Sequence, residues 1–192
     1  MKFGIFGVGR DGTTLLWRLL NSHSQLKIAY EPCDKHFEGK LEDFNAAKQP
    51  MQFSNQIIKL DKTKSDFEKY IFIKRNELDN VYSLIRRNKK PVNLTKFYMK
   101  RYEEIHKRIK EFMNKYPKIC MQIEYENLCL HTEKVLKDIC KFLDIPYEVN
   151  MLEKWREIEV PAWAKSAQYQ TKNIRYVTGT WMRDREFMES IV

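Results

Sequence analysis

The chain has 192 residues, with 35 lysines and arginines against 26 acidic residues and a formal net charge of +9. Hydrophobic residues make up 43% and charged residues 32%, as in ordinary globular proteins. No stretch approaches the roughly 18 consecutive apolar residues of a membrane span, so we expect none. The charge predicts an anionic partner and does not choose among a nucleotide, a nucleic acid, an acidic polymer and a membrane surface.

The chain opens with a predicted strand, turn and helix. Residues 2–8 form a short apolar run, residues 9–12 are typical of a turn, and residues 13–20 place leucines at helical spacing. The apolar run ends at Arg10, too early for the hydrophobic segment of a signal peptide, so we expect a cytoplasmic protein. A second short strand is predicted over residues 26–30.

The central segment alternates between strands and helices. Residues 35–54 are polar and poorly periodic and predict a loop with some helix, whereas residues 56–60 predict a buried strand and residues 63–69 a short helix. Residues 70–74 are β-branched and aromatic and predict another strand. The helix that follows has apolar residues at i, i+3, i+4 and i+7, and Asn76 is its expected N-cap.

Two more helices and one strand precede the C-terminal tail. Residues 95–115 carry one apolar stripe and predict the longest helix, and residues 119–123 predict a strand. We expect Thr132 to cap a last helix that stops before Pro146. The tail, residues 149–192, is irregular and rich in Trp, Lys and Arg.

Alternating strands and helices indicate βαβ units and a parallel sheet. We therefore expect an α/β fold, a three-layer sandwich with a central parallel sheet, in a single domain over residues 1–192 with its cofactor-binding core at about 3–148. Open sheets of this kind bind ligands at the carboxyl ends of their strands. Residues 10–14, Lys59 and Arg75 all follow predicted strands, so they are candidate site residues.

The first turn has the chemistry of a phosphate-binding loop. Gly12 lets backbone N–H groups close on an oxyanion, the helix N-terminus adds donors and partial positive charge, and Arg10 adds full charge. The loop is P-loop-like, but it lacks the lysine of G-x-x-x-x-G-K-[ST], so it does not indicate Mg²⁺-triphosphate chemistry.

Residues 10–23, Arg-Asp-Gly-Thr-Thr-Leu-Leu-x-x-Leu-Leu-x-x-His, resemble the 5′-phosphosulfate loop of the sulfotransferases that use 3′-phosphoadenosine-5′-phosphosulfate (PAPS). The resemblance implies cofactor contacts from Arg10, Asp11, Gly12, Thr13, Thr14 and Leu15. Asp11 replaces the usual Ser of the family, and a carboxylate beside a dianion is unfavourable unless it points away. We expect Asp11 to act as the N-cap of the helix.

A second motif resembles the 3′-phosphate site of the same family. Arg75 ends a strand and Ser83 follows eight residues later on a helix, which is the family's spacing, and Arg87 matches a further basic position. The usual Arg-Asp-Pro is replaced by Arg75-Asn76-Glu77. Tyr125 lies in a segment like the family's Tyr-Glu-x-Leu and is expected near the adenine. The resemblance is nearest to the Golgi-type and bacterial branches, including the tyrosylprotein sulfotransferases.

The resemblance implies transfer of the sulfuryl group of PAPS to a hydroxyl or amine of an unidentified acceptor, with 3′-phosphoadenosine-5′-phosphate (PAP) as product and no metal. Glu31, in Glu31-Pro32, is the expected general base, and His36 is a weaker alternative. Lys59 is the expected cation on the bridging oxygen, although Lys62 and Lys64 are close enough to take that role. Arg10 is a further contact to the leaving phosphate.

The sequence leaves the roles of several residues undecided. Gly179-Thr180-Trp181 is similar to the family's Gly-x-Trp segment, where Thr180 stands in place of a frequent Arg or Lys, and Lys172, Arg175 or Arg183 are candidate substitutes. His23 is expected to be structural. His106 and His131 are expected on helix surfaces.

Two other classes of function remain as alternatives. One is a P-loop nucleotide-dependent small-molecule kinase. The other is a non-catalytic nucleotide- or nucleic-acid-binding protein. Exposed tryptophans beside basic residues would support it, and the candidates are Trp155, Trp163 and Trp181. Under the preferred hypothesis we expect no nucleic-acid partner. The acceptor would be a glycan, a peptide, a lipid or a small molecule, and the protein could form a homodimer.

Overall fold

The computed structural model describes residues 2–32, 40–51, 67–161 and 180–192. In these ranges the strands are β1 (Phe3–Val8), β2 (Ile28–Tyr30), β3 (Ala46–Met51), β4 (Lys69–Lys74) and β5 (Cys120–Glu124). They form one sheet in the order β2-β3-β1-β4-β5, and every neighbouring pair is parallel. The predicted central parallel sheet of an α/β sandwich is confirmed.

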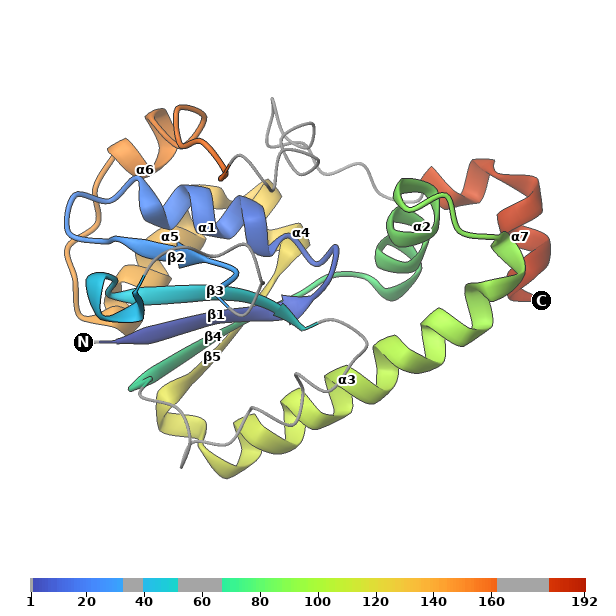
Figure 1. The fold of residues 1–192 in the computed structure, drawn as a ribbon, viewed down its shortest axis with the longest axis horizontal. Coiled ribbons are helices and arrows are strands. Elements are labelled where there is room, and N and C mark those ends of the chain that lie inside the picture. The colour runs from blue at the N-terminus through green and yellow to red at the C-terminus, as the bar shows by residue number, and fades with distance from the viewer. Residues whose placement is uncertain (1, 33–39, 52–66, 162–179) are drawn as a thin grey trace.

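Helices cover both faces of the sheet (Figure 1). One face carries α1 (Thr13–Asn21), α4 (Tyr125–Leu130), α5 (Thr132–Leu143) and α6 (Asn150–Glu153). The other carries the long α3 (Thr95–Lys115), with α2 (Glu77–Arg87) beyond the carboxyl ends of the strands and α7 (Arg185–Ile191) packed beside it. Short 3₁₀ turns lie at Leu41–Asp43, Val92–Leu94, Pro117–Ile119 and Thr180–Arg183.

The two-residue period of the strands divides the core between these faces. On β4, Ile71 and Ile73 pack with α1 and α5, whereas Tyr70 and Phe72 pack with α3. Trp155, which follows α6, is completely buried in the first cluster. This position is incompatible with the exposed stacking surface that a nucleic-acid-binding role would require of it.

Strand β3 corrects one sequence expectation. Residues 46–51 lie inside the segment predicted as loop, yet β3 occupies an interior position of the sheet between β2 and β1. Its polar Lys48 and Gln49 and its Pro50 hide the strand pattern, because sheet propensity depends on tertiary packing. The strand predicted at 56–60 lies outside the described residues, and Lys69 begins β4 where a helix end was expected.

Helix ends follow the capping rules in part. Asn76 caps α2 as predicted, since its side chain accepts a hydrogen bond from the backbone N–H of Asp79 at 3.2 Å. Thr132 does not cap α5, because its hydroxyl donates to the carbonyl of Leu128 at 2.7 Å. Asp144, in the left-handed region at φ 57°, ends that helix.

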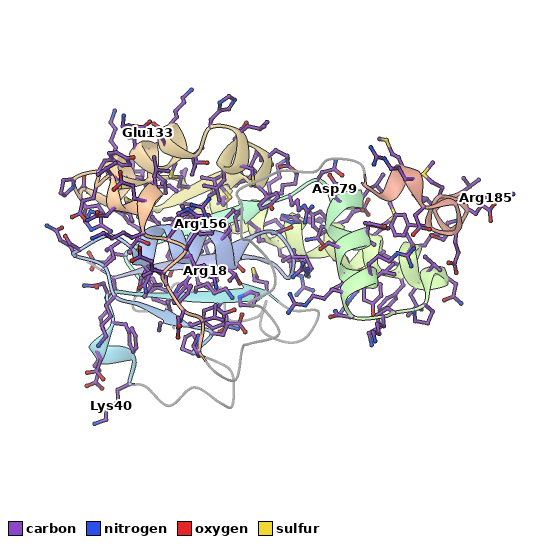
Figure 2. All side chains as sticks on the ribbon, turned by 90° about the horizontal axis from the view of Figure 1, so that it is seen from above. Arg18, Lys40, Asp79, Glu133, Arg156 and Arg185 are labelled. Atoms are coloured by element: carbon purple, nitrogen blue, oxygen red, sulfur yellow. The ribbon has the colours of Figure 1, made fainter. Side chains whose placement is uncertain are left out.

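The molecule is elongated, with α2 and α7 at one end. Seen from above, Glu133 and Arg156 lie over the sheet and Asp79 and Arg185 lie at the α2–α7 end (Figure 2). Asp184 caps α7 and forms an ion pair with Arg86, which fastens α7 to α2. Within the described ranges, none of the helices has both the length and the apolar character that crossing a bilayer would take.

Candidate functional site

The β1–α1 loop has backbone conformations that place amide groups around one point. Arg10 and Gly12 both have positive φ, 82° and 100°. A side chain at Gly12 would be strained, and its Cβ would overlap the ring of Tyr125, so glycine is required. The first turn of α1 then presents backbone N–H groups that have no partner within the helix, which is the arrangement of an anion-binding site.

The remaining residues of this loop divide between core and surface. Thr13 and Leu15 are buried, so only their backbone is suited to meet a ligand. Thr14 is half-buried, and its hydroxyl lies 3.3 Å from the hydroxyl of Tyr30 on β2. The side chain of Thr14 therefore connects the first loop to the end of the neighbouring strand.

The two predicted motifs meet in space. The Nε of Arg10 donates a hydrogen bond to the hydroxyl of Ser83 on α2, at 3.0 Å. Arg75, which follows β4, approaches the carbonyl oxygen of Arg10 with its Nη1 at 3.5 Å. The strands β1 and β4 are adjacent and parallel and end on the side of the sheet where α2 lies (Figure 1), so the residues that follow them lie at one end of the sheet.

This edge concentrates positive charge. Burial, followed by the charges of Arg87 and Arg75, lowers the pKa of Arg10 to about 10. The Nε of Arg75 is buried and has no hydrogen-bond partner in the described structure. Clustered arginines with an unsatisfied donor are unfavourable by themselves, and an anion bound among them would relieve both costs.

Tyr125 forms one wall of this cluster. It begins α4, its ring lies against Gly12, and the guanidinium of Arg75 sits 4.8 Å from the ring centroid. Burial raises the pKa of its hydroxyl, so the side chain is neutral at physiological pH. The aromatic ring of Tyr125 thus lies next to both motifs.

A second group lies at the ends of β2 and β3. Glu31 has a positive φ of 48°, unusual for a non-glycine residue and frequent at functional sites. Its carboxylate accepts a hydrogen bond from the ammonium of Lys48, which is almost completely buried and lies 4.0 Å from the ring centroid of Tyr30. Burial lowers the pKa of Lys48 to about 8, although Glu31 opposes that shift.

Arg87 lies within electrostatic reach of both groups. Its charge lowers the pKa of Arg10 in the first group, and of Lys48 and Tyr30 in the second. The net pKa of Tyr30 is nevertheless raised to about 12, because burial outweighs the cations. A ligand spanning the two groups would therefore meet a cationic cluster at one end and a carboxylate–lysine pair at the other.

Comparisons with known proteins bear on the fold that holds this site. A sequence model described as "Sulfotransferase family" matches residues 67–149. No curated protein matches the sequence of the chain.

The sulfotransferase domain of the Synechococcus PCC 7002 olefin synthase is 15% identical, with TM-score 0.65, and the match covers 98% of this chain and 92% of that one. The mouse sulfotransferase SULT7A1, in complex with PAP, is 15% identical, with TM-score 0.62 and coverages of 98% and 81%. An Alicyclobacillus acidocaldarius sulfotransferase is 16% identical, with TM-score 0.58 and coverages of 81% and 90%.

The chain has a sulfotransferase fold. The family match and the shared fold support an enzyme that transfers a sulfuryl group, which is the activity predicted from the two motifs.

Asp11 is where the structure departs from the sequence expectation for the β1–α1 loop. It does not cap α1, whose N-cap is Gly12 without a side-chain bond. Its fully buried carboxylate accepts hydrogen bonds from the backbone N–H of Val8 and the amide of Asn80, at 2.8 and 2.6 Å. The side chain thus points into the protein, and the unfavourable approach of a carboxylate to a bound dianion does not arise.

The described histidines differ in burial and in the groups they contact. His23 is buried and its Nε2 lies 2.7 Å from the carbonyl oxygen of Pro146, consistent with a structural role. His131 is exposed, as expected. The surface expectation for His106 is wrong, because its Nε2 lies 3.2 Å from the carboxylate of Asp11 and its side chain is only 12% exposed.

Other sequence candidates cannot be placed. Outside the described residues lie Lys59, Lys62, Lys64, His36, Trp163, Lys172 and Arg175. Arg183 is exposed at the end of a 3₁₀ turn that packs against α2. Lys48 is the residue that sequence reasoning missed, because its strand was assigned to a loop. Over the described ranges, no trio of His, Cys, Asp or Glu side chains is arranged to hold a metal ion.

Proposed function

We propose that this sulfotransferase moves the sulfuryl group of PAPS to a hydroxyl or amine of its acceptor and releases PAP. The hydrogen bond between Arg10 and Ser83 is the observation that carries the proposal, because it joins the predicted 5′ and 3′ phosphate motifs at one edge of the sheet. A bisphosphorylated nucleotide matches such a pair of adjoining cationic sites better than a nucleotide with phosphate at one end alone.

The residues present suit such a nucleotide. The N-terminus of α1 and Arg10 would hold the 5′-phosphosulfate, with backbone contacts from residues 11–15. Arg75, Ser83 and Arg87 would hold the 3′-phosphate, and the ring of Tyr125 would lie by the adenine. The buried, unpartnered Nε of Arg75 supports this assignment, since it supplies a donor where an anionic oxygen is needed.

Glu31 is the proposed general base. PAPS supplies the sulfuryl group, and the acceptor oxygen bonds to sulfur while the bond from sulfur to the bridging oxygen breaks. Glu31 accepts the acceptor's proton, and its contact with Lys48 fixes the direction of the carboxylate. Lys48 also carries positive charge at the strand ends, the role that the sequence assigned to Lys59.

Nucleotide preference is the first experiment. Isothermal titration calorimetry with PAP, AMP and ATP should show clear binding of PAP and weak binding of AMP, because only PAP carries the 3′-phosphate. Arg75→Ala should remove this preference, whereas the exposed Arg108→Ala on α3 should keep it. Equal affinity for PAP and AMP in the unchanged protein would overturn the proposal. A cytoplasmic location and a homodimer stay predictions.

A further inference from the structure

Two residues on one turn of α3 contact the segments that carry both phosphate motifs. His106 lies 3.2 Å from the carboxylate of Asp11 in the β1–α1 loop. Tyr102, four residues earlier on the same helix, donates a hydrogen bond from its hydroxyl to the carbonyl oxygen of Arg75. The two rings touch, with centroids 4.3 Å apart. Residues four apart share one helix face, so a single rigid element holds the ends of β1 and β4.

Asp11 contacts α3 and also holds the backbone of the β1–α1 loop. Its backbone N–H donates to the carbonyl of Val8 at 3.0 Å, and its carboxylate accepts the N–H of Val8 in return. Asn80, which bonds the other carboxylate oxygen, also donates to the carbonyl of Gly9 at 3.1 Å. The buried side of the turn before Gly12 is therefore held by the carboxylate of Asp11 and the amide of Asn80.

A fully buried carboxylate is costly without compensation. Burial raises the pKa of Asp11, and His106 is the first of the groups that oppose that shift, ahead of Val8 and Asn80. The amide and backbone donors satisfy hydrogen bonds, but only His106 among these three can add a positive charge. A neutral Ser, the usual residue of the family here, would have no such requirement.

His106 also lines an open cavity of about 600 Å³. The charged residues that line this cavity with His106 come from five elements and from the position after β4; they are Lys74, Arg75, Glu77, Glu103, Glu124 and Glu126. His106 thus borders both a cavity lined by charged residues and, through its Nε2, the buried carboxylate of Asp11.

We propose that Asp11 and His106 are coupled positioning residues, through which α3 sets the form of the 5′-phosphosulfate loop and hence the affinity for PAP. The inference rests on the proposed function, because PAP is the ligand whose loop is positioned. The proposal predicts that PAP affinity depends on His106 only when residue 11 is an aspartate.

A double-mutant cycle tests the coupling. PAP affinity is measured by calorimetry for the unchanged protein, for Asp11→Ser, for His106→Gln and for the pair together. His106→Gln alone should weaken PAP binding about tenfold, because the buried carboxylate loses the imidazole nitrogen that lies 3.2 Å from it. In the Asp11→Ser background the same change should have almost no effect. The exposed His131→Gln is the matched control and should leave PAP binding unchanged in both backgrounds.

The outcomes separate the two proposals. An equal loss from His106→Gln in both backgrounds, or no loss in either, overturns the coupling while leaving PAP binding intact. Failure of the unchanged protein to bind PAP overturns the proposed function instead, and the coupling is then read from thermal unfolding of the same four proteins. If His106→Gln does not fold, the coupling requires that the double variant Asp11→Ser/His106→Gln folds. A double variant that also fails to fold refutes the coupling.

Discussion

Arg10 and Ser83 are 73 positions apart in the chain, and their side chains are joined by a hydrogen bond of 3.0 Å. The contact explains why a serine on α2 belongs to the same site as a loop after β1. It also orients Arg10, whose positive φ is otherwise unfavourable, toward the cationic edge.

Removing the hydroxyl of Ser83 should therefore weaken the 3′-phosphate site most. We expect Ser83→Ala to weaken PAP binding by about tenfold, since a hydrogen bond to a charged group contributes about 1.5–3 kcal/mol. AMP binding should change much less. Calorimetry with both nucleotides makes the comparison, and Ser24→Ala, at an exposed serine bonded to Glu148, is the control. An equal loss for PAP and AMP would contradict the 3′-phosphate assignment.

Glu31 should be needed for transfer and dispensable for nucleotide binding. Glu31→Gln keeps an oxygen that can accept the hydrogen bond from Lys48, but it cannot take a proton from the acceptor. We expect PAP affinity to stay within about twofold and PAP release from PAPS, assayed with a panel of phenol and sugar acceptors, to fall by about 10²–10⁴. The exposed Glu157→Gln should retain full turnover. Retained turnover in Glu31→Gln would refute its role as base.

The buried Lys48 should leave a signature in the pH dependence of stability. Its pKa is about 8 in the folded protein, against 10.5 ordinarily, so between these pH values the unfolded chain binds more protons. The contribution of this group to the free energy of unfolding must then rise as pH rises from about 8 to 10.5.

Lys48→Met removes this titration while keeping an unbranched side chain of similar length. Urea unfolding at several pH values should show that the unchanged protein gains stability over the variant across that window, by on the order of 2 kcal/mol. A stability difference that stays constant from pH 8 to 10.5 would show that burial does not depress the pKa of Lys48.

Gly12 and Gly9 should differ in how much stability they lose when each is replaced by alanine. Gly12→Ala places a side chain at φ 100° and against the ring of Tyr125, and we expect a loss of about 1–3 kcal/mol in the free energy of unfolding. Gly9 has open space around the corresponding position, so Gly9→Ala should stay within about 0.5 kcal/mol of the unchanged protein. Thermal or urea unfolding measures both, and similar values for the two variants would argue against the described loop.

Local patterns were enough for the parts of the site that lie at strand and helix ends. The strand–turn–helix at the N-terminus and the eight-residue spacing from Arg75 to Ser83 depend on periodicity and capping within short segments, so both could be predicted. That the two motifs touch follows from the adjacency of β1 and β4, which parallel connections favour.

Contacts between distant segments could not be predicted in the same way. Lys48 is polar, precedes Gln49 and Pro50, and is buried only because β3 lies inside the sheet beside Glu31. The role of Asp11 depends on His106, which is distant in sequence. One signal was present, since His106 lies next to Ile105 on the apolar stripe of α3 and one turn after Tyr102, a position inconsistent with full exposure.

The place of β1 in the sheet also has a consequence for how the protein is made. This first strand is the central one, and both of its partners, β3 and β4, are encoded later. During synthesis the edge that pairs with β4 stays unpaired until Lys74 has left the ribosome, so the nascent chain exposes one side of an apolar strand for several seconds at ordinary elongation rates. Slow translation before that point should increase aggregation or chaperone capture, and slow translation after it should not.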